Sequence, residues 1–153
     1  IIPAYNAHKT IIKTLLSIEI QTIVDQIKVY IIDDASEKSY DEIKESFKET
    51  LDITIIRNEK NEGPGVARQL GIDNSDGVYI IFIDADDVFY DIYSVENLLN
   101  NIHGYDGVVG LVVEQHNEEE TIVIIGKEED LHGSCTSLSS QNTCLFSPLM
   151  SMI

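Results

Sequence analysis

The sequence has few basic residues, few cysteines and no long apolar run, and each shortage excludes a class of protein. Lysine and arginine number 10 against 27 aspartate and glutamate, which gives a formal net charge of −17 at pH 7. Because a chain with this much negative charge repels a phosphate backbone and an anionic lipid surface, we expect no nucleic-acid partner. Cys135 and Cys144 are the only cysteines, and their spacing fits neither a zinc site nor a disulfide framework.

Targeting patterns are missing as well. No apolar segment approaches the roughly 18 residues that a membrane-spanning helix needs, and none has the pattern of a signal peptide. We therefore expect no transmembrane segment and a cytoplasmic location, with peripheral attachment at the inner face of the membrane as the alternative. The 153 residues suffice for one domain with a buried core. Because the chain starts inside an apolar run and ends without a stop signal, we expect a piece of a longer protein.

What the sequence does contain is a repeated alternation of apolar runs and helical patterns. The apolar runs, which we expect to be strands, are residues 1–2, 29–32, 53–56 and 78–83. The helical patterns are 11–20, for which Asn6 is the predicted N-cap, 40–48, and a helix that begins at Pro64. Continuous apolar strands that alternate with helices predict a mainly parallel sheet with helices on both faces, a Rossmann-like three-layer α/β sandwich.

After residue 91 this alternation ends. A short helix is expected over 94–101. Residues 106–113 and 121–125 predict two strands around an acidic turn at 117–120, an antiparallel hairpin added to the sheet. Past Lys127 we find no period that predicts an element.

Two carboxylates follow the run at 78–83. Asp84 and Asp86 are separated only by Ala85, and this spacing suits a hard divalent cation such as Mg²⁺ or Mn²⁺ that keeps positions open for phosphates. The alternative is a solvated acidic turn, because aspartate is common in turns. Open α/β sheets bind ligands at the carboxyl edge of their strands, which is where we expect this pair to lie.

Other residues at the same edge have the chemistry of a nucleotide site, although each also has an ordinary explanation as turn or packing. They are Tyr5, Asp33, Asp34, Gly63, Gly65 and Arg68. A tyrosine ring can stack on a base, and an aspartate can accept a hydrogen bond from a base N–H or a ribose hydroxyl. Backbone N–H groups at a helix start favour phosphate, and an arginine one turn further can pair with its oxygens.

Taken together and in order, four segments resemble the signature of family-two inverting glycosyltransferases with the GT-A fold. The segments are 1–6, 32–36, 61–71 and 83–87. The resemblance implies a nucleotide-diphosphate-sugar donor, UDP-sugar by default, a glycan or lipid-linked acceptor, and a divalent cation, Mn²⁺ or Mg²⁺. It also implies that residues 1–91 are the nucleotide-sugar-binding part of a single truncated domain and that 92–153 begin its acceptor side.

The resemblance assigns roles to particular side chains. Tyr5 and the Pro3 backbone would pack on the base, and Asp34 or its neighbour Asp33 would bind the base N–H. Asp84 would contact the ribose or the cation, and Asp86 would be the main metal ligand. The full set assigned to the nucleotide is Pro3, Tyr5, Asp33, Asp34, Asn61, Gly63, Arg68, Asp84 and Ala85.

Departures from the family pattern leave the catalytic base unassigned. Gln69 stands where members more often carry asparagine, a mild change. The base of this inverting family is a carboxylate well beyond the metal motif, so we expect it beyond Ile153. The acidic run at 128–130 is interpreted as solvated loop.

Two alternatives compete with the transferase. The run from Ile83 to Val88 also fits the motif of haloacid-dehalogenase-like phosphatases, in which Asp84 would be a nucleophile. That family places the motif on its first strand, whereas three strand–helix units precede it here. The other alternative is a non-catalytic remnant of the same fold that binds a nucleotide or a cation.

Overall fold

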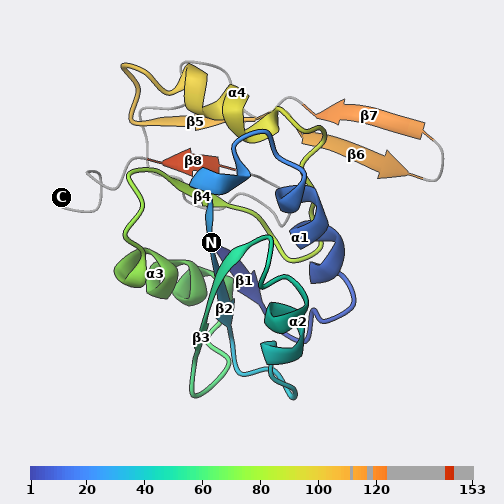
Figure 1. Ribbon diagram of the computed structural model, residues 1–153, viewed down its shortest axis with the longest axis vertical. Helices are drawn as coiled ribbons and strands as arrows, with labels where there is room; N and C mark the ends of the chain where they lie inside the picture. Colours follow the sequence, from blue (N-terminus) through green and yellow to red (C-terminus); the bar gives the residue numbers. More distant parts are fainter. Residues whose placement is uncertain (111, 117–118, 124–143, 147–153) are drawn as a thin grey trace.

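Three parallel strands form the centre of the first half of the chain (Figure 1). They are β1 (Ile2–Ala4), β2 (Lys28–Asp33) and β3 (Asp52–Arg57), and they pair in this order. In the register of the sheet, Ile31 of β2 lies between Ile2 of β1 and Ile55 of β3. Isoleucine and valine suit these positions, because β-branched side chains pack well on a pleated, buried surface. The computed structural model describes residues 1–110, 112–116, 119–123 and 144–146.

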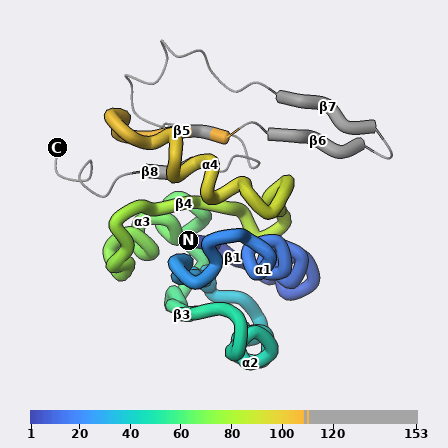
Figure 2. The backbone as a smooth tube through the Cα atoms, turned by 45° about the horizontal axis from the view of Figure 1, so that its top comes forward, coloured from blue at the N-terminus to red at the C-terminus, as the bar shows by residue number. Residues whose placement is uncertain are grey.

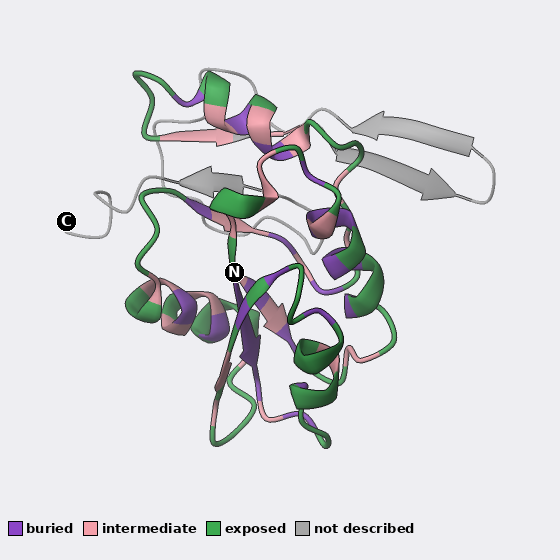
Figure 3. Ribbon diagram, in the orientation of Figure 1, coloured by how far each residue is buried: buried purple, intermediate pink, exposed green. Residues whose placement is uncertain are grey.

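Helices cover both faces of this sheet, as predicted. Helices α1 (Ile11–Glu19) and α2 (Asp41–Ser46) pack with β1–β3 in the larger apolar cluster, which includes the fully buried Tyr40. Helix α3 (Pro64–Asn74) lies on the opposite face, where Ala67 and Leu70 pack on the other side of β2 (Figures 1 and 3). A short 3₁₀ helix, Val24–Gln26, precedes β2.

The start of α1 differs from the prediction. Thr10, not Asn6, is the residue that precedes the helix, and no side chain caps it. Asn6 instead has a φ of 52°, and its Oδ1 accepts a hydrogen bond from the Glu37 backbone N–H at 2.9 Å. The predicted apolar face is also rotated: Ile11 and Leu15 are buried, but the predicted positions Ile12, Leu16 and Ile20 are exposed.

Strand β4 (Ile80–Phe82) is shorter than the predicted run, and it lies beside β1. The Ile1 N donates to the Ile81 carbonyl at 2.7 Å, and the Ile83 N–H donates to the Ile1 carbonyl at 3.2 Å. These two bonds flank Ile1 in the pattern of a parallel pair, and Figure 2 shows the chain start between β1 and β4. The carboxyl end of β4 therefore reaches the same edge as those of β1 and β2.

The second half builds antiparallel structure around β4. Strand β8 (Cys144–Phe146), for which the sequence showed no pattern, lies between β4 and β5 (Gly107–Val109). Helix α4 (Ser94–Asn101) is the predicted short helix, and its Leu98 packs with Ile81 of β4. Strands β6 (Val112–His116) and β7 (Glu119–Val123) form an antiparallel hairpin, as predicted, but the predicted first strand, 106–113, is divided between β5 and β6. Among the described residues, the hairpin is a separate two-stranded sheet and, contrary to the prediction, is not added to the main one.

Candidate functional site

A hollow of about 460 Å³ lies at the carboxyl edge of β1 and β4. It brings together six of the predicted site residues, Pro3, Tyr5, Arg68, Asp84, Ala85 and Asp86. Three further lining residues were not predicted as contacts: Ala7, Thr10 and Pro64. Three segments that are distant in sequence therefore meet at one site: residues 3–10, the first two turns of α3 and the turn after β4.

A second hollow, of about 540 Å³, is larger but has different chemistry. Its lining is mostly aliphatic and includes Val29 and Ile80, and none of the predicted site residues borders it. Its two charged side chains, Lys28 and Asp76, pair with each other at 2.6 Å. Because recognition of a polar ligand needs convergent unpaired polar groups, the smaller hollow is the better functional candidate.

In the candidate hollow, Arg68 of α3 forms an ion pair with Asp84. The Arg68 Nη2 lies 2.5 Å from the Asp84 Oδ1, and both side chains are partly buried. Burial raises the pKa of Asp84, the neighbouring Asp86 raises it further, and the Arg68 guanidinium opposes both effects. The guanidinium thus favours the ionised form of Asp84 against the effect of burial and occupies its Oδ1, which leaves the Oδ2 for a ligand.

Asp86 and Asp87 complete a run of three carboxylates in four residues. Asp86 is exposed and lines the hollow. The Asp87 Oδ2 is buried without a hydrogen-bond partner, and burial, together with Asp86 and Asp84, raises the pKa of Asp87 to about 6. This turn thus concentrates negative charge, and within the described residues Asp84 is the only one of the three carboxylates with an ion-pair partner.

The residues of this turn fit a divalent cation. Among the described residues, no group of three or more His, Cys, Asp or Glu side chains is arranged as a metal centre. Mg²⁺ and similar cations, however, are commonly held by one or two carboxylates together with substrate phosphates. Asp84 and Asp86, both at the hollow, supply such a pair, and the unpartnered oxygen of Asp87 indicates a local excess of acceptors over donors.

Asp34 lies at the same edge but outside the hollow. Its Oδ1 accepts hydrogen bonds from the Asn58 side chain at 2.7 Å and the Glu62 N–H at 3.1 Å. Its Oδ2 accepts one from the Gly63 N–H at 2.7 Å. Asp34 therefore fixes the loop that leads into α3, and Gly63, with φ of 87°, supplies the left-handed backbone that this path requires.

Asp33 is likewise occupied by protein partners. It is buried, it forms an ion pair with Arg57 of β3, and its Oδ1 accepts a hydrogen bond from the Ser36 N–H at 2.8 Å. Nucleotide contacts at Asp33 and Asp34 stay predictions, as they do at Asn61 and Gly63. Asn61 also belongs to the loop, since its Oδ1 accepts a hydrogen bond from the Gly63 N–H at 3.1 Å.

The lining residues that the sequence did not predict carried no chemical signal. The Thr10 hydroxyl donates to the Ala7 carbonyl at 3.2 Å, so both residues belong to the turn that starts α1. Pro64 was predicted only as a helix start, which the structure confirms. Small and apolar lining residues are typical of ligand sites, but only the fold shows which of them line one.

Comparison with known proteins gives a consistent result. The family model described as Glycosyl transferase family 2 matches residues 1–143. An uncharacterized glycosyltransferase of Rickettsia felis is 42% identical over 90 residues, which make up 59% of this chain and 15% of that protein. The chain thus spans a small fraction of the length of the curated relatives it matches.

Solved structures agree on the fold. One is residues 1–349 of TarS from Staphylococcus aureus, in complex with UDP-GlcNAc. The match covers 69% of this chain and 31% of the TarS chain, with a TM-score of 0.64 and 26% sequence identity. The mannosyltransferase PcManGT from Pyrobaculum calidifontis, in complex with GDP-Man and Mn²⁺, matches 95% of this chain and 43% of its own with a TM-score of 0.66. At 18% identity the second likeness shows the fold alone. Both confirm the Rossmann-like α/β fold of GT-A type.

Proposed function

This chain belongs to glycosyl transferase family 2, and we propose that it binds a nucleotide-diphosphate-sugar and takes part in moving the sugar to an acceptor hydroxyl with inversion. The observation that carries the proposal is the hollow itself, which combines an exposed aromatic ring, Tyr5, an arginine, Arg68, and the carboxylates Asp84 and Asp86. An aromatic face suits a base, and the arginine suits phosphate oxygens. The phosphatase alternative has no comparable support, because the motif follows the fourth strand.

We propose uracil as the base. TarS was solved with UDP-GlcNAc and with UDP, and it is the neighbour with the higher identity of the two compared above. Tyr5 is 53% exposed at the hollow, which leaves its ring free to stack, and Pro3 borders the same space. The loop that Asp34 fixes, with Asn61 and Gly63, would lie along the nucleotide.

The proposed cation, Mn²⁺ or Mg²⁺, would be held by Asp86 with Asp84 as second ligand. When bound, it supplies Lewis-acid neutralisation of charge that develops on the leaving diphosphate. Arg68 pairs with Asp84 at the hollow, which orients the carboxylate and favours its ionised form against the effect of burial. Arg68 and the backbone at the start of α3 supply the positive potential for the diphosphate in an otherwise acidic protein.

The catalytic base and the acceptor site belong to the proposal only in outline. The acidic run 128–130 lies outside the described residues, and we propose a carboxylate of the longer protein as the base, with a glycan or lipid-linked acceptor. Within the described part of the chain, no helix has the length and apolar character to cross a membrane. The cytoplasmic location and the division at residue 91 stay predictions.

Calorimetric titration with UDP- and GDP-sugars, with and without Mn²⁺, tests the proposal. We expect one UDP-sugar to bind per chain in a Mn²⁺-dependent manner, and Asp86→Ala to remove that dependence. Failure of every nucleotide-sugar to bind would contradict it. Binding of a donor by the complete protein without transfer to any acceptor would favour the non-catalytic alternative.

A further inference from the structure

A buried tyrosine outside the hollow holds the loop that carries Tyr5. Tyr40 precedes α2, and none of its surface is exposed. Its Oη accepts a hydrogen bond from the Ala7 backbone N–H at 2.9 Å, although the two residues are 33 positions apart. Because Ala7 lines the hollow, this bond joins the core directly to the wall of the candidate site.

Ser36 anchors the neighbouring amide. Its Oγ accepts a hydrogen bond from the Asn6 N–H at 2.9 Å and donates to the Tyr40 Oη at 3.4 Å. Ser36 is itself held, since its N–H donates to Asp33 and its carbonyl accepts from the Arg57 Nη2 at 2.5 Å. The two amides that follow Tyr5 are therefore both bound by side chains of the 36–40 segment.

The loop needs this outside support. Asn6 has a φ of 52°, in the left-handed region that few residues other than glycine adopt. A loop with an unfavourable backbone conformation keeps one geometry only where its surroundings determine it. The His8 ring adds to that support by stacking on Tyr40, with ring centroids 4.1 Å apart and planes 4° from parallel.

We propose that Tyr40 is a positioning residue for nucleotide recognition: its hydroxyl fixes the Ala7 amide and so holds Tyr5 where the base stacks. The inference rests on the proposed function. If the loop already has its bound conformation, binding of the nucleotide does not include the free-energy cost of ordering the loop. A residue that does not touch the nucleotide can therefore strengthen nucleotide binding.

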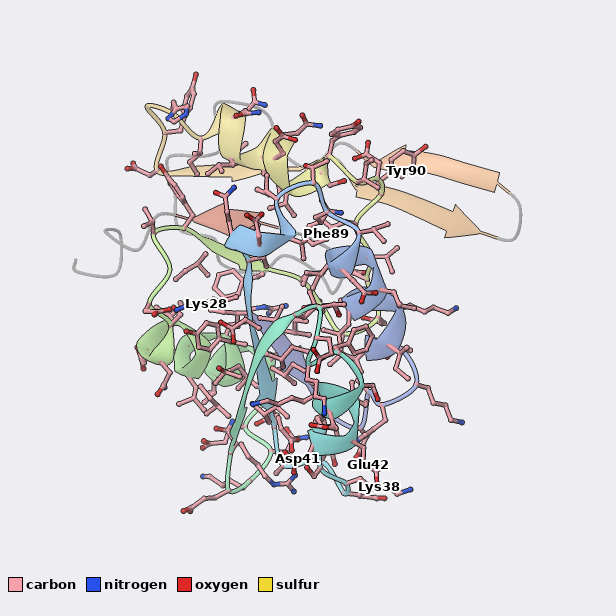
Figure 4. All side chains as sticks on the ribbon, viewed as in Figure 1. Lys28, Lys38, Asp41, Glu42, Phe89 and Tyr90 are labelled. Carbon is pink, nitrogen blue, oxygen red and sulfur yellow. The ribbon has the colours of Figure 1, made fainter. Side chains whose placement is uncertain are left out.

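The test compares two buried tyrosines, Tyr40, which precedes α2, and Tyr30 of β2. Tyr40→Phe removes the Oη and keeps the buried ring. Tyr30→Phe is the matched control: Tyr30 is 9% exposed, and its Oη donates to the Asp76 Oδ1 at 2.9 Å. Tyr30 packs against α3, on the face of the sheet opposite α2. Its partner Asp76 also pairs with Lys28, which Figure 4 shows far from Lys38 and Asp41.

The first readout is the affinity for UDP in the presence of Mn²⁺. We expect Tyr40→Phe to raise the Kd about tenfold and Tyr30→Phe to change it less than twofold, with similar small losses in melting temperature for both. Unchanged affinity for Tyr40→Phe, or an equal loss for both variants, would overturn the proposal. If Tyr40→Phe fails to fold, Ser36→Ala, which removes the Asn6 anchor, replaces it with the same expectation.

A double-mutant cycle shows whether Tyr40 acts through Tyr5. Tyr5→Ala removes the stacking ring, and Tyr40→Phe added to it should weaken UDP binding less than twofold further. A full tenfold further loss would show that Tyr40 acts elsewhere and would overturn its role with Tyr5.

Amide hydrogen exchange in the ligand-free protein separates this inference from the proposed function. Tyr40→Phe should speed exchange at Ala7 at least tenfold and leave the amides of β3 unchanged. If the wild-type protein binds no nucleotide while Ala7 responds in this way, the proposed function fails and takes the nucleotide role of Tyr40 with it. If the wild type binds and Ala7 does not respond, only the Tyr40 proposal fails.

Discussion

Two acidic turns that look alike in the sequence serve different purposes in the fold. Asp33 and Asp34 follow β2, and Asp84, Asp86 and Asp87 follow β4. The first pair accepts hydrogen bonds and an ion pair from Arg57, from the Asn58 side chain and from backbone N–H groups of two loops. Among the residues that the structure describes, the second turn has one ion-pair partner, Arg68, and the buried Asp87 Oδ2 has no hydrogen-bond partner.

The difference shows what decides the role of a strand-end carboxylate. Buried acceptors normally find donors within the protein, and a carboxylate that does so stabilises the fold. A carboxylate left short of donors instead retains acceptor capacity for a ligand, at some cost in stability. The turn after β2 is therefore mainly a scaffold, and the turn after β4 is the better candidate for binding a cation. Substitutions in the two turns should have opposite consequences.

The largest effect is expected at Asp34. Asp34→Ala removes the acceptor of three hydrogen bonds: it takes away the partner of the Glu62 N–H and leaves the Gly63 N–H only its longer bond to the Asn61 Oδ1, so the free energy of unfolding should fall by about 3 kcal/mol. Chemical denaturation measures it. Asp86→Ala is the control from the other turn and should change stability by less than about 0.5 kcal/mol. Equal losses in the two variants would remove the distinction between the turns.

Arg57→Met should follow. It leaves the buried Asp33 carboxylate without its ion-pair partner, and because the Arg57 side chain is 47% exposed, we expect a loss of about 2 kcal/mol rather than the full cost of breaking a buried pair. Lys60→Met is the matched control, since it breaks an exposed pair with Glu62 and should cost less than about 0.5 kcal/mol. A loss no larger than the control's would show that Asp33 needs no partner.

Alanine substitutions at Gly63 and at Gly65 should have opposite effects on stability. A Cβ at either position meets nothing within 4 Å, so only the backbone differs. Gly63→Ala places a side chain at φ of 87° and should cost about 1.5 kcal/mol. Gly65→Ala lies within α3 and should raise stability by up to about 1 kcal/mol. Thermal unfolding measures both, and a stabilising Gly63→Ala would contradict the described path of the loop.

The smallest expected effect is the pH dependence of stability that Asp87 causes. Because burial raises its pKa to about 6, the folded state binds this proton more tightly than the unfolded state, and stability falls as pH rises from about 4 to 6. Without divalent cation, Asp87→Asn should therefore be more stable than wild type at pH 7 by about 1 kcal/mol, since solvent screens a half-buried group, and similar at pH 4. A variant less stable at pH 7 would show that the charge has a partner.

The sequence predicted the layers of the fold and much of the site because both depend on local patterns. Apolar runs mark β2 and β3, and the strand-end positions of Tyr5, Asp84 and Asp86 follow from them. Arg68 was predicted from its distance to a helix start, and the structure brings it to Asp84.

What the sequence did not reveal depends on contacts between distant segments. Asn6 looked like a helix cap, but its amide and side chain bind Ser36 and Glu37, about 30 residues away. Asp33 and Asp84 follow equivalent apolar runs, and only the positions of Arg57 and the β3–α3 loop distinguish their roles. Strand β8 is three residues long and is defined by its pairing with β4 and β5, which no local pattern encodes.

The central claim is that the turn after β4 binds a divalent cation together with a nucleotide. The most direct measurement is the electron paramagnetic resonance of free Mn²⁺ during titration of the protein in the presence of UDP, with wild type, Asp86→Ala, and Glu42→Ala as an exposed acidic control on α2. We predict one Mn²⁺ bound per wild-type and Glu42→Ala chain, and affinity at least tenfold weaker for Asp86→Ala. Equal binding by all three proteins, or none by the wild type, would contradict the claim.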